Sequence, residues 1–320
     1  MKEIKVTEIN GIKIGNAQDQ CGGTGCTAII CEKGAVAGVD VRGGAPASRE
    51  TELLRPEKMM EKINCVMLSG GSAFGLEAGD GAMQYLEERG IGFGTGFGIV
   101  PIVCGASIFD LQVGDSKCRP DKQMGYDACR ASEHGEPQTG CFGAGTGASV
   151  GKYLGPDRMM KSGLGIYAVR LENIQCAAVV VVNALGDVID YETHERIAGV
   201  LSKDGMNILN TEQLMYNGIE SQKEIFSGNT TLGCIITNAD ITKNQANKLA
   251  SVAHNGYANA IRPVHTSVDG DTVFVMSTGE KQVAADALGA LATEVTARAI
   301  KNAIMSAESS YGLKSSHDLL

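Results

Sequence analysis

The sequence predicts an α+β fold in which layered sheets are covered by helices. Short runs rich in apolar and β-branched residues, each bounded by turn residues, predict strands at 27–31, 35–41, 65–68, 174–182, 232–237 and 273–276. Apolar residues at helical spacing predict helices at 76–89, 243–261 and 283–304. Strands and helices come in alternating groups without a repeat of fixed period. This pattern is typical of sheets packed under helices.

Composition narrows the class of protein. The 320 residues are 43% hydrophobic, enough for a sizeable core in one large domain or two small ones. The net charge of -9 argues against a general binder of nucleic acid or anionic membranes, because both need a basic face. The charged N-terminus lacks an apolar signal segment, so we expect a cytoplasmic protein with its 10 cysteines reduced. The cysteine spacing fits no zinc pattern, and we expect no metal and no cofactor.

The first elements predict a hairpin, with strands 27–31 and 35–41 joined by a turn at 32–34. A loop with two arginines follows, before a predicted helix at 53–60. Arg42 and Arg49 either hold a substrate carboxylate by bidentate contacts or form ion pairs with neighbouring Glu50 and Glu52. The ion pairs are the favoured interpretation.

Three glycine-rich stretches raise the question of phosphate binding. The loop 69–75 follows a predicted strand and precedes a helix, but its spacing fits neither phosphate-loop fingerprint. The stretch 90–98 alternates glycine with other residues, which favours a strand whose backbone packs closely against another layer. Residues 143–148 match GxGxxG/A without a clear strand before them. A dinucleotide site is therefore disfavoured, although the backbone amides of this loop can line a pocket.

Two lysines and an asparagine are candidates for a site in the middle of the chain. Lys152 and Lys161 lie in glycine-rich loops, where a lysine is either solvated or, near an active site, able to shift its pKa or stabilise an anion. Asn183 ends the most apolar strand, which we expect to be central in its sheet. The asparagine is either a turn former or a neutral donor for an oxyanion hole.

A hydroxyl residue stands where a turn enters a buried strand, after a polar connection at 210–227. Gly228 and Asn229 favour the turn, and Thr230 begins the apolar run. If Thr230 attacks the carbonyl of Asn229 and the peptide breaks, the threonine becomes an N-terminus that carries both a nucleophile and an amine base. The alternative is an ordinary turn.

Two carboxylates flank one glycine directly before the last strand. Asp269 and Asp271 are either part of an Asp-Gly hairpin turn or an acid/base pair in which repulsion raises one pKa. His254 lies within a predicted helix and is interpreted as packed or solvated, and His134 as solvated.

Five stretches in a fixed order resemble the L-aminopeptidase/D-esterase family of self-cleaving hydrolases, which includes β-aminopeptidases and the nylon-oligomer hydrolase. They are 38–46, 68–76, 143–148, 229–232 and 269–274, and the resemblance extends over about 10–307. It implies one domain over residues 1–320, a four-layer αββα sandwich of the N-terminal-nucleophile type with two packed mixed sheets flanked by helices. It also implies an oligomer, and we expect a homotetramer.

The same resemblance implies specific roles. Autocleavage is expected between Asn229 and Thr230, giving fragments 1–229 and 230–320, with Thr230 as the nucleophile. Asn183 is implied as oxyanion donor, and Lys152 as supporting lysine with Lys161 as rival. Asp269 and Asp271 are implied to tune the threonine amine. Threonine with Asp-x-Asp, in place of serine with Ser-x-Glu, is similar to the nylon-hydrolase branch.

The expected substrates are small amino-acid amides, short peptides or amino-acid oligomers. Two other functions stay open from the sequence. One is a nucleotide-binding enzyme that uses the glycine-rich loops, and the other is an uncleaved relative that acts as a binding or assembly protein.

Overall fold

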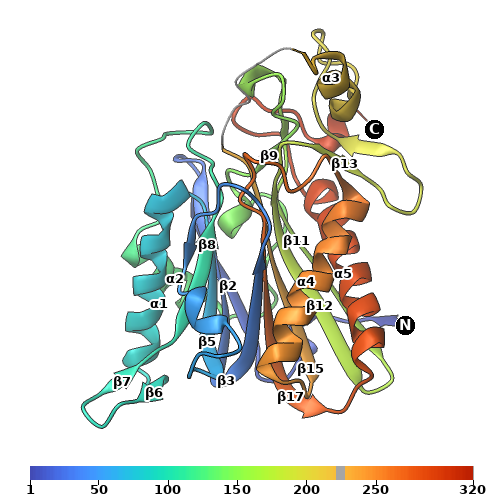
Figure 1. Cartoon of the computed structure of the whole chain (residues 1–320). Helices are drawn as coiled ribbons and strands as arrows, with labels where there is room; N and C mark the ends of the chain where they lie inside the picture. The colour runs from blue at the N-terminus through green and yellow to red at the C-terminus, as the bar shows by residue number, and fades with distance from the viewer. Residues whose placement is uncertain (221–227, 320) are drawn as a thin grey trace.

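The computed structural model describes residues 1–220 and 228–319, and its centre is one mixed ten-stranded sheet (Figure 1). Among the strand pairs of these described residues, only β15–β17 and β5–β8 are parallel. The order across the sheet is β1 (Lys2–Glu3), β11 (Leu164–Leu171), β12 (Ile174–Asn183), β15 (Thr230–Ala239), β17 (Thr272–Lys281), β3 (Thr24–Val41), β5 (Lys62–Ser69), β8 (Val103–Ser107) and β4 (Ser48–Arg49), with β2 (Lys13–Asp19) paired to β3.

Strand β3 joins the two halves of this sheet. Its first half pairs with β2, from Thr24 to Ile30, and its last part pairs with β17, from Val36 to Val41. The predicted hairpin at 32–34 is therefore wrong: the chain runs straight on as one strand. The exposed Glu32 and Lys33 and the left-handed Gly34, with a φ of 76°, form an irregularity opposite β5 instead of a reversal.

Two pairs of helices stand on opposite sides of the sheet (Figure 1). α1 (Ala78–Glu87) and α2 (Lys122–Ala131) pack near β2, β3 and β5. On the other side, α4 (Lys243–Ala260) packs near β3 and β17, and α5 (Ala285–Met305) packs near β11 and β12. A shorter helix, α3 (Thr211–Asn217), lies within the predicted connection 210–227. The end of that connection, residues 221–227, lies outside the described part of the chain. Thr242 and Gln245 form a capping box at the start of α4.

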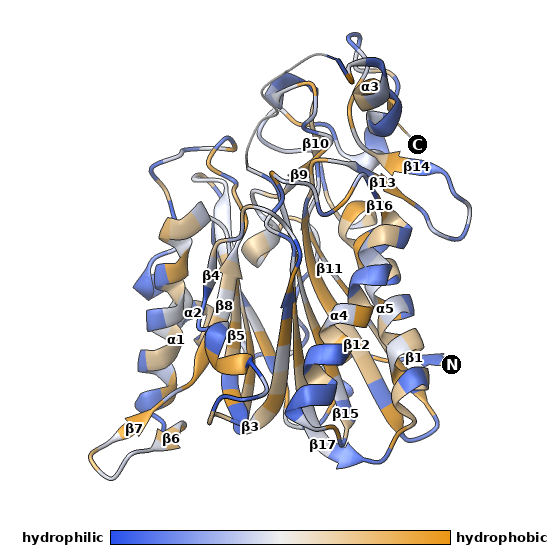
Figure 2. Ribbon diagram, in the orientation of Figure 1, coloured by the Kyte–Doolittle hydropathy of each residue, from blue (hydrophilic) through white to orange (hydrophobic). Residues whose placement is uncertain are grey.

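Alternate residues of the central strands pack into different apolar clusters, because successive strand side chains point to opposite faces. In β12, Ala178, Val180 and Val182 belong to the cluster under α4 and α5. Ala177, Val179 and Val181 face a second cluster that contains residues of β3, β5 and β8. A third cluster lies between β3, β5 and the helices α1 and α2. Figure 2 shows the strands mostly in the apolar colour. The prediction that 174–182 is a central strand is confirmed.

Two other local predictions are wrong. The stretch 90–98 lies in a protruding hairpin of β6 (Phe93–Gly94) and β7 (Ile99–Val100), where an added Cβ at Gly94 or Gly98 would meet no atom within 4 Å. The predicted helix at 53–60 is only a short 3-10 turn at Glu52–Leu54, because Pro56 pushes Arg55 into an extended conformation.

The remaining elements are short. Small sheets are formed by β9 (Ser149–Val150) with β10 (Met160–Lys161), and by β14 (Arg196–Ala198), β13 (Asp187–Ile189) and β16 (Ile261–Arg262). Further 3-10 turns lie at Val6–Glu8, Ser72–Glu77, Gly143–Gly145, Pro156–Arg158 and Ser316–Asp318. Among the helices of the described residues, none combines the length and apolarity needed to cross a membrane.

Candidate active site

The first residue of β15 lies between the two neighbours that sequence reasoning had singled out. Thr230 is opposite Asn183 in the antiparallel register with β12, and Asn229 forms a parallel bridge to Asp269. The Thr230 hydroxyl is hydrogen-bonded to the carbonyl oxygen of Asn229. The same carbonyl accepts the backbone N–H of Gly270 at 2.8 Å. The peptide between Asn229 and Thr230 is thus held on both sides by buried polar groups.

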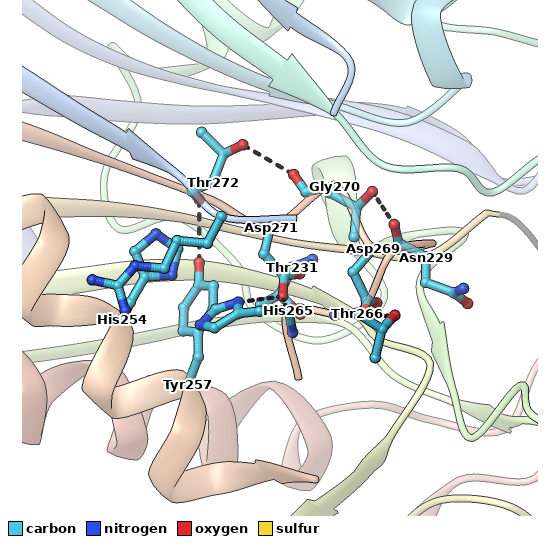
Figure 3. A network of polar contacts seen from close by, with 12 residues as sticks. Asn229, Thr231, His254, Tyr257, His265, Thr266, Asp269, Gly270, Asp271 and Thr272 are labelled. Carbon is cyan, nitrogen blue, oxygen red and sulfur yellow. Dashed lines mark hydrogen bonds and ion pairs between the residues drawn. The ribbon is translucent and has the colours of Figure 1, made fainter. Parts of the chain in front are cut away.

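Asp271 is fully engaged by donors from both sides (Figure 3). Its Oδ1 accepts the backbone N–H of Thr231 at 2.7 Å. Its Oδ2 is 3.0 Å from the backbone nitrogen of His265 and 2.7 Å from Nδ1 of the same residue. The tautomer of His265 that carries its hydrogen on Nδ1 donates to this oxygen in the contact.

Asp269 has its own donors. Its Oδ2 accepts the backbone N–H of Thr266 at 3.0 Å and the Thr266 hydroxyl at 2.5 Å, and its Oδ1 accepts the N–H of Leu185 at 3.4 Å. Burial, together with repulsion from Asp271, raises the pKa of Asp269 to about 6. The Asp-Gly-Asp segment is not a hairpin turn, because β17 pairs with β15 and β3. The Asp271 carboxylate instead bonds the start of β15 at Thr231, whereas the Asp269 carboxylate bonds Thr266 and Leu185.

Lys152, which follows β9, is the lysine that reaches this cluster. Its Nζ donates to the carbonyl oxygen of Asn183 at 3.1 Å, to Asn183 Oδ1 at 2.6 Å and to the carbonyl oxygen of Gly228 at 3.2 Å. Burial lowers the pKa of Lys152 to about 7, although Asp269 and Asp110 oppose the shift. A lysine in this state exchanges its proton near neutral pH.

Lys161, the rival candidate, is equally buried but bonds elsewhere. Its Nζ donates to the carbonyl oxygens of Gly145, Ala148 and Ser162 at 3.1, 3.0 and 2.5 Å. It therefore fixes the glycine-rich loop 143–148, and within the described residues it makes no hydrogen bond to Asn183 or Thr230.

The side chain of Asn183 is oriented by three partners. Its Oδ1 accepts from Lys152 and from the backbone N–H of Ser149 at 3.1 Å, and its Nδ2 donates to the carbonyl oxygen of Phe109 at 3.0 Å. The amide nitrogen carries two hydrogens, and this bond uses one of them. Phe109 follows β8, so the loop after that strand sets the direction of the asparagine donor.

Backbone N–H groups of the glycine-rich loops donate hydrogen bonds to side chains of the protein. The backbone N–H of Gly71 and the Thr24 hydroxyl donate to the buried Asp110 carboxylate, each at 2.7 Å. In the GxGxxG match, the N–H groups of Gly143 and Ala144 donate to side chains of Gln18 and Thr27. Amides engaged in this way do not cradle a phosphate, which counts against the nucleotide-binding alternative.

The loop after β3 lies across the two aspartates. The N–H groups of Arg42 and Gly43 donate to the Asp271 carbonyl, and that of Ala45 donates to the Asp269 carbonyl. Both arginines form ion pairs, but the predicted partners are wrong. Arg42 pairs with Asp40 at 2.8 Å, and Arg49 pairs with Asp80 at 2.6 Å.

Sequence reasoning missed His265 and Thr266, which bond the two aspartates. The available signal was their position in the polar loop directly before Asp269. His254, predicted to be packed or solvated, is fully buried with Nε2 3.0 Å from the Asp40 carbonyl oxygen, and His134 is exposed as predicted. No group of three metal-ligating side chains occurs within the described ranges 1–220 and 228–319.

A hydroxyl, an amide, two carboxylates and a lysine gathered at the start of a central strand are the groups that acyl transfer requires. Fold and site together define a hydrolase of amide bonds. The chain belongs to peptidase family S58, whose model matches residues 5–317.

Relatives of this chain carry peptidase and amidase names. An uncharacterized aminopeptidase of Mycobacterium leprae is 37% identical, with 96% of this chain and 92% of the relative covered. A 6-aminohexanoate-oligomer endohydrolase of Agromyces sp. is 31% identical, with 92% and 84% covered. The L-aminopeptidase D-Ala-esterase/amidase of Ochrobactrum anthropi, described as a variant of the Ntn hydrolase fold, superposes with a TM-score of 0.68 at 16% identity, with 95% of this chain and 86% of that chain covered. That last likeness shows a shared fold.

Proposed function

We propose that the chain is an autoprocessing amide hydrolase in which Thr230 first cuts its own peptide bond and then acts as an N-terminal nucleophile. The observation that carries this proposal is the contact of the Thr230 hydroxyl with the Asn229 carbonyl, which Gly270 already engages from the other side. The products would be residues 1–229 and 230–320 of one hydrolase domain.

In the first step, Thr230 Oγ bonds to the carbonyl carbon of Asn229, and the oxygen of that carbonyl becomes an oxyanion. The Gly270 N–H, 2.8 Å from this oxygen, is the donor in position to stabilise it. We propose that the neutral form of Lys152 is the base. Its Nζ contacts the carbonyl oxygen of Gly228, on the N-terminal side of the scissile bond. The proton passes to the Thr230 nitrogen as the C–N bond breaks, and water then hydrolyses the ester.

In the second reaction, the new α-amino group takes the proton from Thr230 Oγ. Such a group titrates at roughly 7.7–8.0 when unperturbed, so much of it is neutral near physiological pH. The hydroxyl attacks the carbonyl carbon of a substrate amide, and the second hydrogen of Asn183 Nδ2 donates a hydrogen bond to the oxyanion that forms. Asp269 and Asp271 orient the new terminus. The amine product leaves, and water releases the acyl group from Thr230.

The proposed substrates are small amino-acid amides, short peptides or amino-acid oligomers. Two kinds of relative support this range, since one is named an aminopeptidase and the other an endohydrolase of 6-aminohexanoate oligomers. We also propose a homotetramer, and a cytoplasmic location in keeping with the ten free thiols.

The finer architecture is part of the proposal. We propose that the sheet folds on itself at β3 into two packed halves, so that with the helix pairs the domain is a four-layer αββα sandwich. Three separate apolar clusters, one between the strand groups and one under each helix pair, support this arrangement.

The test is the intact mass of purified protein. Wild type should give two fragments whose masses sum to 33.4 kDa plus one water, whereas Thr230→Ala should remain one chain and hydrolyse no amino-acid amide or anilide. Thr230→Ser is the matched variant, since it keeps the hydroxyl, and it should still cleave. A cut Thr230→Ala chain would refute the assignment, and a wild type that stays whole would favour the binding-protein alternative.

A further inference from the structure

His265 is held in an unusual backbone conformation beside the candidate site. Its φ of 57° lies in the left-handed region, which costs free energy for a residue with a side chain. In this conformation its backbone N–H and its ring Nδ1 both reach the same atom, Asp271 Oδ2, at 3.0 and 2.7 Å. The strained conformation thus places two nitrogen atoms of His265 against one carboxylate oxygen of Asp271.

The ring is also fixed by packing. It stands edge-on to the buried His254 ring, with centroids 4.7 Å apart and an interplanar angle of 75°, and its centroid is 6.0 Å from that of Tyr257. Its Nε2 is buried and has no hydrogen-bond partner within the described part of the chain. The contact with Asp271 is therefore the polar interaction that this ring is arranged to make (Figure 3).

With Oδ2 held by His265, Asp271 directs its other oxygen to the N–H of Thr231, the residue after Thr230. We infer that His265 is a positioning residue: through Asp271 it fixes the backbone from which the Thr230 hydroxyl and its future amine project. This inference rests on the proposed function. Misplacement of a nucleophile by a fraction of an ångström slows attack without weakening substrate binding, because binding does not require the aligned hydroxyl.

Two variants separate the ring from the strained backbone. His265→Gly removes the ring, relieves the left-handed strain and keeps the backbone N–H. His265→Asn keeps a side-chain N–H donor close to the position of Nδ1, in a residue that tolerates positive φ. The matched control is His194→Gly, because His194 has a φ of 63° and lies exposed on the turn between β13 and β14.

The experiment measures the half-time of self-cleavage, the kcat and KM of the cleaved enzyme on an amino-acid p-nitroanilide, and the melting temperature. For His265→Gly we expect cleavage and kcat slower by about tenfold or more, with KM near that of wild type. The melting temperature should fall, because a packed ring and a hydrogen bond to a buried carboxylate are lost. His265→Asn should recover most of both rates, and His194→Gly should match wild type.

Unchanged rates in His265→Gly overturn the inference, as does a His265→Asn chain that is no better than His265→Gly. A rise in KM with unchanged kcat would mean that His265 binds substrate and would overturn the positioning role. Failure of the proposed function is distinguishable, because it would appear as an uncut and inactive wild type.

Discussion

Burial, more than any single ion pair, sets the chemistry of individual residues at this site. Lys152 and Asp269 are both almost completely buried, and burial is the main cause of each pKa shift. It lowers the lysine pKa to about 7 and raises the aspartate pKa to about 6. A base for self-cleavage is needed before the α-amino group of Thr230 exists, and Lys152 supplies one that is half neutral near pH 7.

Self-cleavage should therefore depend on pH through Lys152. Below its pKa of about 7 the nitrogen holds its proton and accepts none, so the rate should rise about tenfold per pH unit and level off above pH 7. Newly translated chain moved into buffers of different pH and sampled on gels would give this profile. Lys152→Met should cleave slowly at every pH, and a Lys152→Met chain that follows the wild-type profile would exclude Lys152 as the base.

Among the helices and strands, those that depend on interactions between residues close in sequence were predicted correctly. The helix at 243–261 and the strand at 174–182 are both predicted from the sequence, because the helical spacing of apolar residues and a run of apolar side chains are local features. The continuation of β3 past 32–34 was not predicted, because it depends on pairing with β5 and β17, far along the chain.

The candidate site shows the same division. The nucleophile and the two aspartates carry a recognisable pattern, whereas the roles of Lys152 and Lys161 differ only in which carbonyls each buried ammonium reaches. The role of His265 was not predicted, because its local sequence indicates neither a left-handed conformation nor a contact with Asp271.

The loop after β3 is an element whose role is open to a direct test. A Cβ added to Gly43 would lie 2.2 Å from the Asp269 carbonyl oxygen and 2.4 Å from the Asp271 nitrogen, and these backbone atoms have no flexible end that can move away. Gly43→Ala should lose about 1–3 kcal/mol of unfolding free energy and cleave more slowly, because the aspartates are displaced. Urea unfolding and intact mass measure the two effects. Gly98→Ala is the control, since its Cβ would meet no atom within 4 Å.

For the molecule as a whole, the proposed cut falls at a place where the two fragments are interleaved. β15 and β17 belong to the C-terminal fragment and are parallel neighbours, while their outer edges pair with β12 and β3 of the N-terminal fragment. The central apolar cluster likewise takes residues from both fragments. One broken peptide bond therefore removes none of the sheet pairing.

The fragments should consequently behave as one folded unit after cleavage. Separating them requires the β12–β15 and β3–β17 ladders to open and the central cluster to be exposed to water, a cost comparable to unfolding the domain. Wild type run on a size-exclusion column in native buffer should elute as a single peak that resolves into two bands on a denaturing gel, and it should melt in one transition. The same material in concentrated guanidinium should separate into its two fragments. Two peaks in native buffer would mean that the interleaved pairing does not hold the cleaved chain together, and the nucleophile would then be parted from Asn183 and Lys152 as soon as it formed.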